Sequence, residues 1–150
     1  MTEESPVISF LFATGVATAL PCLRLVRVGS MTKVLVVEDH ADGRQTLQKQ
    51  LELMGFAVAI ARNGKEGVQT AIAEKPELIL MNSLMPEMDG WEATRILRGT
   101  PETKEIPVLA ITALSRSSDL EAWLQAGCND YIVKPFTSDE LLRKITALLR

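Results

Sequence analysis

Two carboxylates, an amide, a hydroxyl and an amine each directly follow, or close, a short apolar run of the kind that forms a buried strand. They belong to Glu38, Asp39, Asn82, Thr112 and Lys134. Adjacent carboxylates repel each other and are stable together only with a cation. Oxygen ligands of this kind suit Mg²⁺, which keeps several waters and often also holds phosphate. A lysine ammonium and a hydroxyl are suited to phosphoryl oxygens, so the set predicts phosphoryl-transfer chemistry, which depends mainly on positioning and charge neutralisation.

The elements that must position these groups alternate along the chain from Met31. Short apolar, β-branched runs predict strands, and apolar residues at helical spacing predict helices between them. The predicted strands cover 33–37, 57–61, 77–81, 107–112 and 131–133, and the predicted helices cover 41–54, 65–74, 91–98, 119–126 and 139–149. Gly55 and Gly127 are expected to end two of these helices, and Ser138 to N-cap the last one.

This alternation predicts an α/β fold, with a doubly wound five-stranded parallel sheet and helices on both faces. Ligand sites in such sheets lie beyond the carboxyl ends of the strands, near the topological switch point. The polar groups at the strand ends should therefore meet at one edge of the sheet.

Composition bounds the class of protein. The chain has 150 residues, of which 47% are hydrophobic and 23% charged, so one globular domain with or without a tail is expected, and a disordered chain, a collagen or a coiled coil is excluded. The net charge of −3 supplies no basic field, so no nucleic-acid partner is expected. Two distant cysteines, Cys22 and Cys128, favour a reducing, cytoplasmic location over a disulfide framework or zinc site. The single histidine, His40, cannot build a multi-histidine site and is expected at the rim of the pocket.

The first thirty residues differ from the rest. Residues 7–23 form an apolar run that follows two acidic residues and precedes two arginines. An acidic start does not suit a secretory signal, and the run is short for a spanning helix. We therefore expect residues 1–30 to be a non-structural leader, with a membrane anchor or a signal peptide as alternatives, and residues 31–150 to be the functional domain.

Five motifs give residues 31–150 a resemblance to a known family. They are Val-Val-Glu-Asp at 36–39, Met-Pro-Glu-Met-Asp-Gly at 85–90, Thr-Ala at 112–113, Ala-Gly-Cys-Asn-Asp-Tyr at 126–131 and Lys-Pro-Phe at 134–136. With these motifs the stretch resembles a receiver domain of two-component response regulators, and its layout is similar to the single-domain chemotaxis regulator. The resemblance implies a flavodoxin-like sheet with strand order 2-1-3-4-5. It also implies a protein that accepts a phosphoryl group from a sensor histidine kinase or phosphotransfer protein onto an aspartate.

The resemblance further implies roles for individual residues. Glu38 and Asp39 would hold Mg²⁺ together with the backbone carbonyl of Leu84. Lys134 would pair with the phosphoryl group, and the bond from Lys134 to Pro135 would be cis.

The resemblance also implies an output surface. Thr112 and Tyr131 would be the switch pair that reports phosphorylation. A downstream protein would bind the face formed by the helix at 119–126, the strand at 131–133 and the last helix. Trp123 belongs either to the core or to this surface, where it would anchor a partner.

One position departs from the family pattern. The acceptor aspartate is expected three residues before Met85, where this chain has Asn82. An amide is nearly non-nucleophilic, so we expect no normal acyl phosphate there and weaker Mg²⁺ binding. Ser83 should point away from the pocket, and Asp89 has no positional reason to reach it. The asparagine could be engineered or natural, and slow deamidation before Ser83 could restore an aspartate.

Three functions fit these observations. The first is a stand-alone receiver in a phosphorelay, without an output domain and not an enzyme, in which the acceptor is replaced. The second is a pseudo-receiver, a phosphorylation-independent protein-interaction module. The third, a small Mg²⁺-dependent phosphatase-like enzyme, lacks a nucleophile at Asn82.

Overall fold

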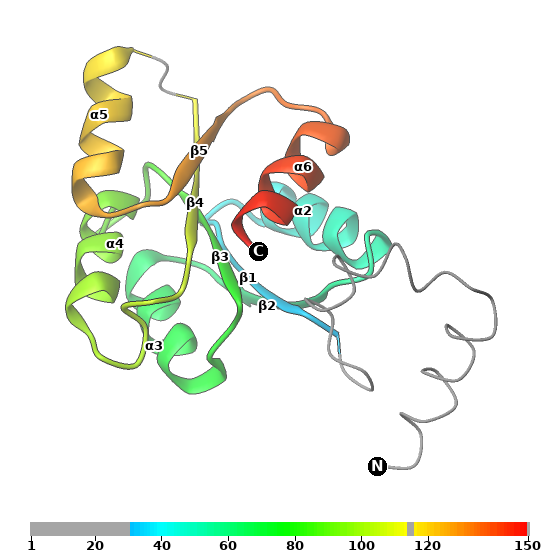
Figure 1. Ribbon diagram of the computed structural model, residues 1–150, viewed down its shortest axis with the longest axis horizontal. Coiled ribbons are helices and arrows are strands. Elements are labelled where there is room, and N and C mark those ends of the chain that lie inside the picture. Colours follow the sequence, from blue (N-terminus) through cyan, green and yellow to red (C-terminus); the bar gives the residue numbers. More distant parts are fainter. Residues whose placement is uncertain (1–30, 114–115, 150) are drawn as a thin grey trace.

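The computed structural model describes residues 31–113 and 116–149, which form five strands and five helices (Figure 1). The strands are β1 (Lys33–Val37), β2 (Ala57–Ala61), β3 (Leu78–Asn82), β4 (Val108–Thr112) and β5 (Asp130–Val133). The helices are α2 (Ala41–Leu53), α3 (Gly64–Glu74), α4 (Gly90–Gly99), α5 (Ser117–Ala126) and α6 (Ser138–Leu148). The predicted leader at 1–30, including the apolar run at 7–23, lies outside the described residues.

All five strands are parallel and lie in the order β2-β1-β3-β4-β5, which confirms the predicted sheet. The register aligns the carboxyl ends. Val37 pairs with Met81, Asn82 with Ile111, and Thr112 with Val133. Polar residues end or follow the strands β1, β3, β4 and β5. They therefore lie at the same edge of the sheet.

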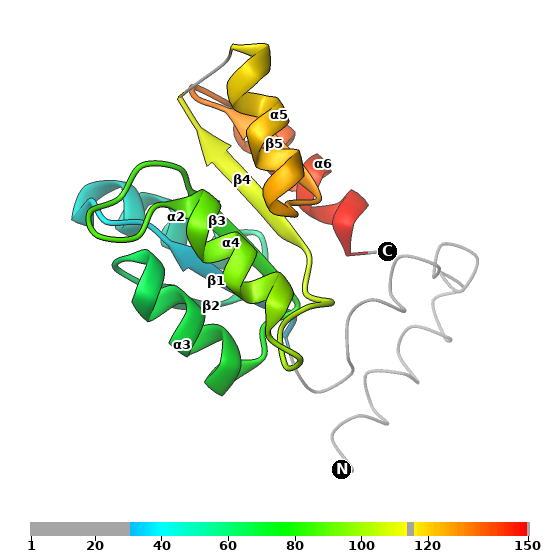
Figure 2. The same ribbon diagram turned by 90° about the vertical axis from the view of Figure 1, so that its left-hand side faces the viewer.

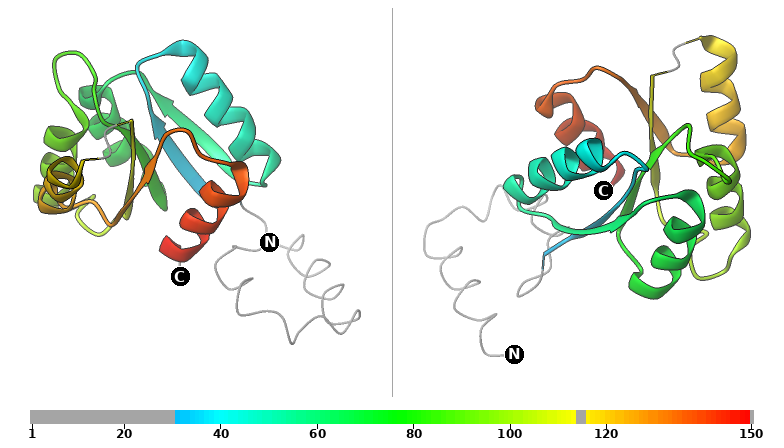
Figure 3. Two further views of the ribbon diagram at one scale, coloured as in Figure 1. Left: turned by 90° about the horizontal axis from the view of Figure 1, so that it is seen from above. Right: turned by 180° about the vertical axis from the view of Figure 1, so that it is seen from behind.

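Each face of the sheet carries its own hydrophobic core. Helices α3, α4 and α5 cover one face, and α2 and α6 cover the other, as Figures 1, 2 and 3 show. Side chains alternate between the two cores along each strand, so Leu35 and Val37 point to one core and Val34 and Val36 to the other. Burial on both faces explains why the strands read as continuous apolar runs rather than as alternating patterns.

Most predicted boundaries are close to the observed ones, and two differ in a way that matters. Strand β3 runs from Leu78 to Asn82 rather than from 77 to 81, so Asn82 is itself the last strand residue. The N-cap of α6 is Thr137 and not Ser138, because Thr137 forms a reciprocal capping box with Glu140. The Ser138 hydroxyl instead accepts a hydrogen bond from Gln50 at 2.9 Å.

The two predicted helix-ending glycines are confirmed. Gly55 has φ +98° and Gly127 has φ +111°, the left-handed conformation that glycine adopts without steric cost. Within 31–113 and 116–149, no helix combines the length and the apolar character that crossing a bilayer requires.

Candidate functional site

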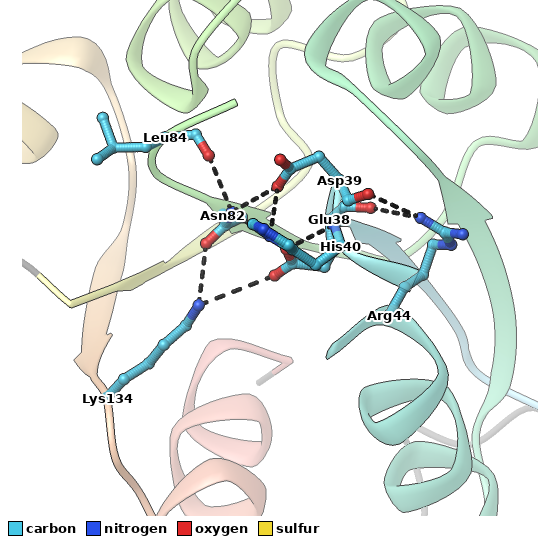
Figure 4. A network of polar contacts seen from close by, with 7 residues as sticks. All are labelled: Glu38, Asp39, His40, Arg44, Asn82, Leu84 and Lys134. Atoms are coloured by element: carbon cyan, nitrogen blue, oxygen red, sulfur yellow. Dashed lines mark hydrogen bonds and ion pairs between the residues drawn. The ribbon is translucent and has the colours of Figure 1, made fainter. Parts of the chain in front are cut away.

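The strand-end side chains meet around the amide of Asn82 (Figure 4). The amide nitrogen Nδ2 of Asn82 donates to Asp39 Oδ1 at 3.2 Å and to Glu38 Oε2 at 3.3 Å. It also lies 3.2 Å from the backbone carbonyl of Leu84, which it can donate to as well. Three oxygens of the predicted metal site thus converge on one nitrogen atom.

Lys134, the residue that follows β5, completes the network. Its Nζ donates to Asn82 Oδ1 at 3.2 Å and lies 3.9 Å from Glu38 Oε1. The amide therefore uses its oxygen toward the ammonium and its nitrogen toward the carboxylates. The neutral amide therefore lies between two carboxylates, to which it donates, and one ammonium group, from which it accepts.

The segment after β1 is held by contacts that the sequence did not suggest. Arg44, in the first turn of α2, donates from Nη1 to the carbonyl oxygens of Glu38 at 3.0 Å and Asp39 at 3.4 Å. The backbone N–H of His40 donates to Glu38 Oε2 at 3.1 Å. The His40 side chain is 79% exposed, which confirms its predicted place at the rim of the pocket. An arginine six residues after a strand-end acid is the only sequence signal for the role of Arg44, and it is a weak one.

The remaining predicted site residues lie on β4, β5 and the turn after them. Thr112 ends β4 and is fully buried, and its carbonyl accepts the Lys134 backbone N–H at 2.8 Å. The Lys134–Pro135 peptide bond is cis, as expected. Tyr131 is half-buried on β5, and Lys144 Nζ lies 5.4 Å from the centre of its ring.

Trp123 lies in the core, as one of its two predicted locations had it, and the alternative that made it an anchor on the output surface is wrong. Its side chain is completely buried and stacks on Trp91, with ring centroids 5.0 Å apart. A Cβ at Gly90 would overlap the Asn82 carbonyl and lie 2.6 Å from the Trp123 ring. Glycine at position 90 thus allows α4 to lie close to the end of β3 and to the Trp123 ring. The spacing of Trp123 with Leu120 and Leu124 is compatible with either location, because only packing against α4 decides it.

No neighbour within the described region supplies a carboxylate in place of the missing one. Asp89 is the N-cap of α4, and its side chain accepts the Glu92 backbone N–H at 2.9 Å. Ser83 is buried beyond the strand end, and its backbone N–H donates to Ile111 O at 3.1 Å. Deamidation requires that same nitrogen to attack the Asn82 side chain, so this hydrogen bond opposes it.

Similarity to known proteins shows which family this chain belongs to. The sequence-family model of the response regulator receiver domain matches residues 34–146. The chain belongs to this family. Receiver domains act in two-component signalling, generally as non-enzymatic modules.

Relatives of known name are response regulators. The response regulator MprA of Mycobacterium tuberculosis is 37% identical over 118 residues, which cover 79% of this chain and 50% of that protein. MprA of Mycolicibacterium vanbaalenii is 36% identical over 118 residues, which again cover 79% of this chain and 50% of that protein. This chain therefore spans about half the length of the curated relatives it matches.

Solved receiver structures have the same fold. The chemotaxis protein CheY4 of Vibrio cholerae superposes with a TM-score of 0.76 at 28% identity, over 79% of this chain and 99% of that one. The receiver domain of a sensor histidine kinase from Pseudomonas aeruginosa has a TM-score of 0.75 at 32% identity, over 80% of this chain and 98% of that one. The latter holds a magnesium ion in its active-site cleft.

The residues of this chain suit such an ion. Receiver domains bind Mg²⁺ at an acidic site. Here two carboxylates, one buried and one partly exposed, and a backbone carbonyl converge on one point, which is an all-oxygen donor set that a hard cation prefers.

Proposed function

We propose that this receiver domain, with residues 31–150 as its extent, works in two-component signalling without carrying a phosphoryl group on residue 82. The observation that supports the proposal is the Asn82 amide and its contacts. Asn82 occupies the acceptor position of the family pattern, and an amide has no oxygen nucleophilic enough to attack phosphorus. Neither Ser83 nor Asp89 is placed to take over the reaction.

The amide also replaces part of what a cation would do. Glu38, Asp39 and the Leu84 carbonyl would hold Mg²⁺ in this site, and the ion would neutralise the charge of a phosphate donor there. The amide nitrogen already shares its two N–H donors among these oxygens, and one anionic ligand is missing compared with an aspartate. We therefore propose that Mg²⁺ binds more weakly to this chain than to a receiver with aspartate at the same position.

The amide network also favours a second candidate function, a phosphorylation-independent interaction module. Lys134 and both acids are already joined through one neutral side chain, so the pocket has one satisfied arrangement without a phosphoryl group. A module of this kind would present the same surface with and without a phosphodonor, and it would need no catalytic turnover.

The partners that we propose are a sensor histidine kinase or phosphotransfer protein and a downstream protein in the cytoplasm. The downstream protein would bind the face formed by α5, β5 and α6. Tyr131, which is half-buried, and Leu124, which is 51% exposed, supply apolar contact area on this face. Leu124 would then be the apolar contact of α5 on this face, where Trp123 was one of two alternatives.

Intact-mass measurement after incubation with acetyl phosphate and Mg²⁺ tests the proposal. We expect no species heavier by about 80 Da, the mass of one phosphoryl group. Asn82→Asp is the matched variant and should become labelled, because Glu38, Asp39, Thr112 and Lys134 are all present. A stable phosphoryl adduct mapped to residue 82 of the unaltered chain would refute the proposal. Partner capture that rises only after phosphodonor treatment would refute the second candidate.

A further inference from the structure

The imidazole of His40 stands beside both acids of the site (Figure 4). Its Nδ1 lies 3.4 Å from Asp39 Oδ1 and 3.5 Å from Glu38 Oε2. One ligand atom from each of the three residues lies within 4.8 Å of the other two. The proposed magnesium site uses only oxygen ligands, so this nitrogen has no role in it.

The backbone around the three residues limits how far they can separate. His40 is the extended N-cap residue of α2, and its own N–H donates to the Glu38 carboxylate. Arg44 holds the carbonyls of Glu38 and Asp39 from the other side. The imidazole is 79% exposed, so an ion and its water ligands can reach it from solvent.

The spacing of these atoms fits a small metal ion. Nitrogen and oxygen ligands lie about 2.1 Å from Zn²⁺, and two ligands of a tetrahedral ion are then about 3.4 Å apart. The observed separations of 3.4 and 3.5 Å from Nδ1 are in this range. Imidazole nitrogen favours zinc, copper, iron or nickel, whereas carboxylate, carbonyl and water suit magnesium.

We propose that Glu38, Asp39 and His40 form a site for a divalent transition metal of the Zn²⁺ class, with His40 as the ligand that sets the preference. The inference rests on the proposed function in assigning Glu38 and Asp39 to a cation and in the proposed weakening of the magnesium site by Asn82. Three protein ligands leave further positions for water, as in an open zinc site. The loss of one anionic oxygen at position 82 weakens the magnesium site, and the imidazole offers a transition metal a ligand that magnesium does not favour.

The single histidine of the chain makes a direct test feasible. The imidazole ¹H–¹³C NMR signals of the full chain report on His40 alone, and Zn²⁺ is added at fixed pH. Affinities for Zn²⁺ and, separately, Mg²⁺ are measured by calorimetry for the unaltered chain and for His40→Asn. Cys22→Ser is the control that removes another soft zinc ligand outside the described residues.

We expect saturable changes of the imidazole signals at one Zn²⁺ per chain, unaffected by Cys22→Ser. His40→Asn should weaken Zn²⁺ binding by about 10-fold to 100-fold, the range seen even for loss of groups that only support a ligand. Its affinity for Mg²⁺ should change less than about twofold, because magnesium favours oxygen ligands.

Imidazole signals that do not respond to saturating Zn²⁺ would overturn the inference, and this measurement does not depend on the folding of any variant. Equal losses of Zn²⁺ and Mg²⁺ affinity in His40→Asn would also overturn it. Zn²⁺ binding through His40 without measurable Mg²⁺ binding would leave this inference standing and refute the proposed magnesium site. Phosphoryl labelling of residue 82 would refute the proposed function and leave the metal preference unaffected.

Discussion

The substitution Asn82→Asp should destabilise the metal-free protein and strengthen its response to Mg²⁺. A carboxylate in place of the amide puts a third negative charge where Nδ2 now lies, 3.2 Å from Asp39 Oδ1 and 3.3 Å from Glu38 Oε2. At an effective dielectric constant near 20, each like-charge pair at this distance repels by about 5 kcal/mol. The attraction to Lys134 Nζ, 3.2 Å from Oδ1, offsets about one of the two repulsions.

About one uncompensated repulsion therefore remains before the site relaxes. Asp39 is partly exposed and Lys134 is exposed, so solvent and side-chain movement screen most of it. We expect Asn82→Asp to lower the free energy of unfolding by about 1–3 kcal/mol without Mg²⁺. Mg²⁺ binds the folded state, so it should recover more stability for the aspartate form, for which its affinity is higher.

Urea unfolding of both proteins, in EDTA and in Mg²⁺, measures both effects. Asn63→Asp is a matched control with the same chemical change at the N-cap of α3, where asparagine and aspartate are nearly equivalent. This control should unfold at nearly the same urea concentration as the parent and should not respond to Mg²⁺. The reasoning is refuted if Mg²⁺ stabilises the asparagine form as much as the aspartate form, because the charge at position 82 would then have no effect on the site.

Three further predictions follow from the same structure. Trp123→Ala should lower the free energy of unfolding by about 3–5 kcal/mol in urea melts, because it leaves a cavity in the core. Tyr131→Ala should lower it less and should weaken capture of a downstream partner. Equal losses of stability in the two variants would contradict this prediction. Burial raises the pKa of the Cys128 thiol from 9.0 to about 11. The unfolded chain then releases the thiol proton first, so stability should fall as pH rises from about 9 to about 11, and Cys128→Ala should remove that part of the decline in urea melts. A chain that begins at Met31 should unfold in one cooperative transition, since both described cores lie within 31–149; aggregation of this chain alone would count against it.

The sheet, its helices and the edge at which chemistry would occur could all be predicted from the amino-acid sequence. The strands of a parallel sheet are buried on both faces, so runs such as residues 34–37 are apolar throughout and distinct from the helical spacing between them. Because parallel strands end at the same edge, the residues that end or follow them could be grouped before any contact was known. The departure at Asn82 was also visible, since it concerns the type of one residue in a motif.

The contacts of individual side chains could not be predicted in this way, because they depend on how the elements pack. Whether Trp123 is core or surface depends on its packing against Gly90 and Trp91 of α4, a helix that β4 separates from α5 in the sequence. Arg44 binds the Glu38 carbonyl, and the His40 imidazole lies beside Asp39. Both contacts depend on how the chain turns from β1 into α2. The same holds for Asn82 at the end of β3, whose amide bonds two acids that follow β1 and a lysine that follows β5. A periodic pattern records how deeply a residue is buried, whereas a hydrogen bond between strands depends on atomic positions that only the packed fold fixes.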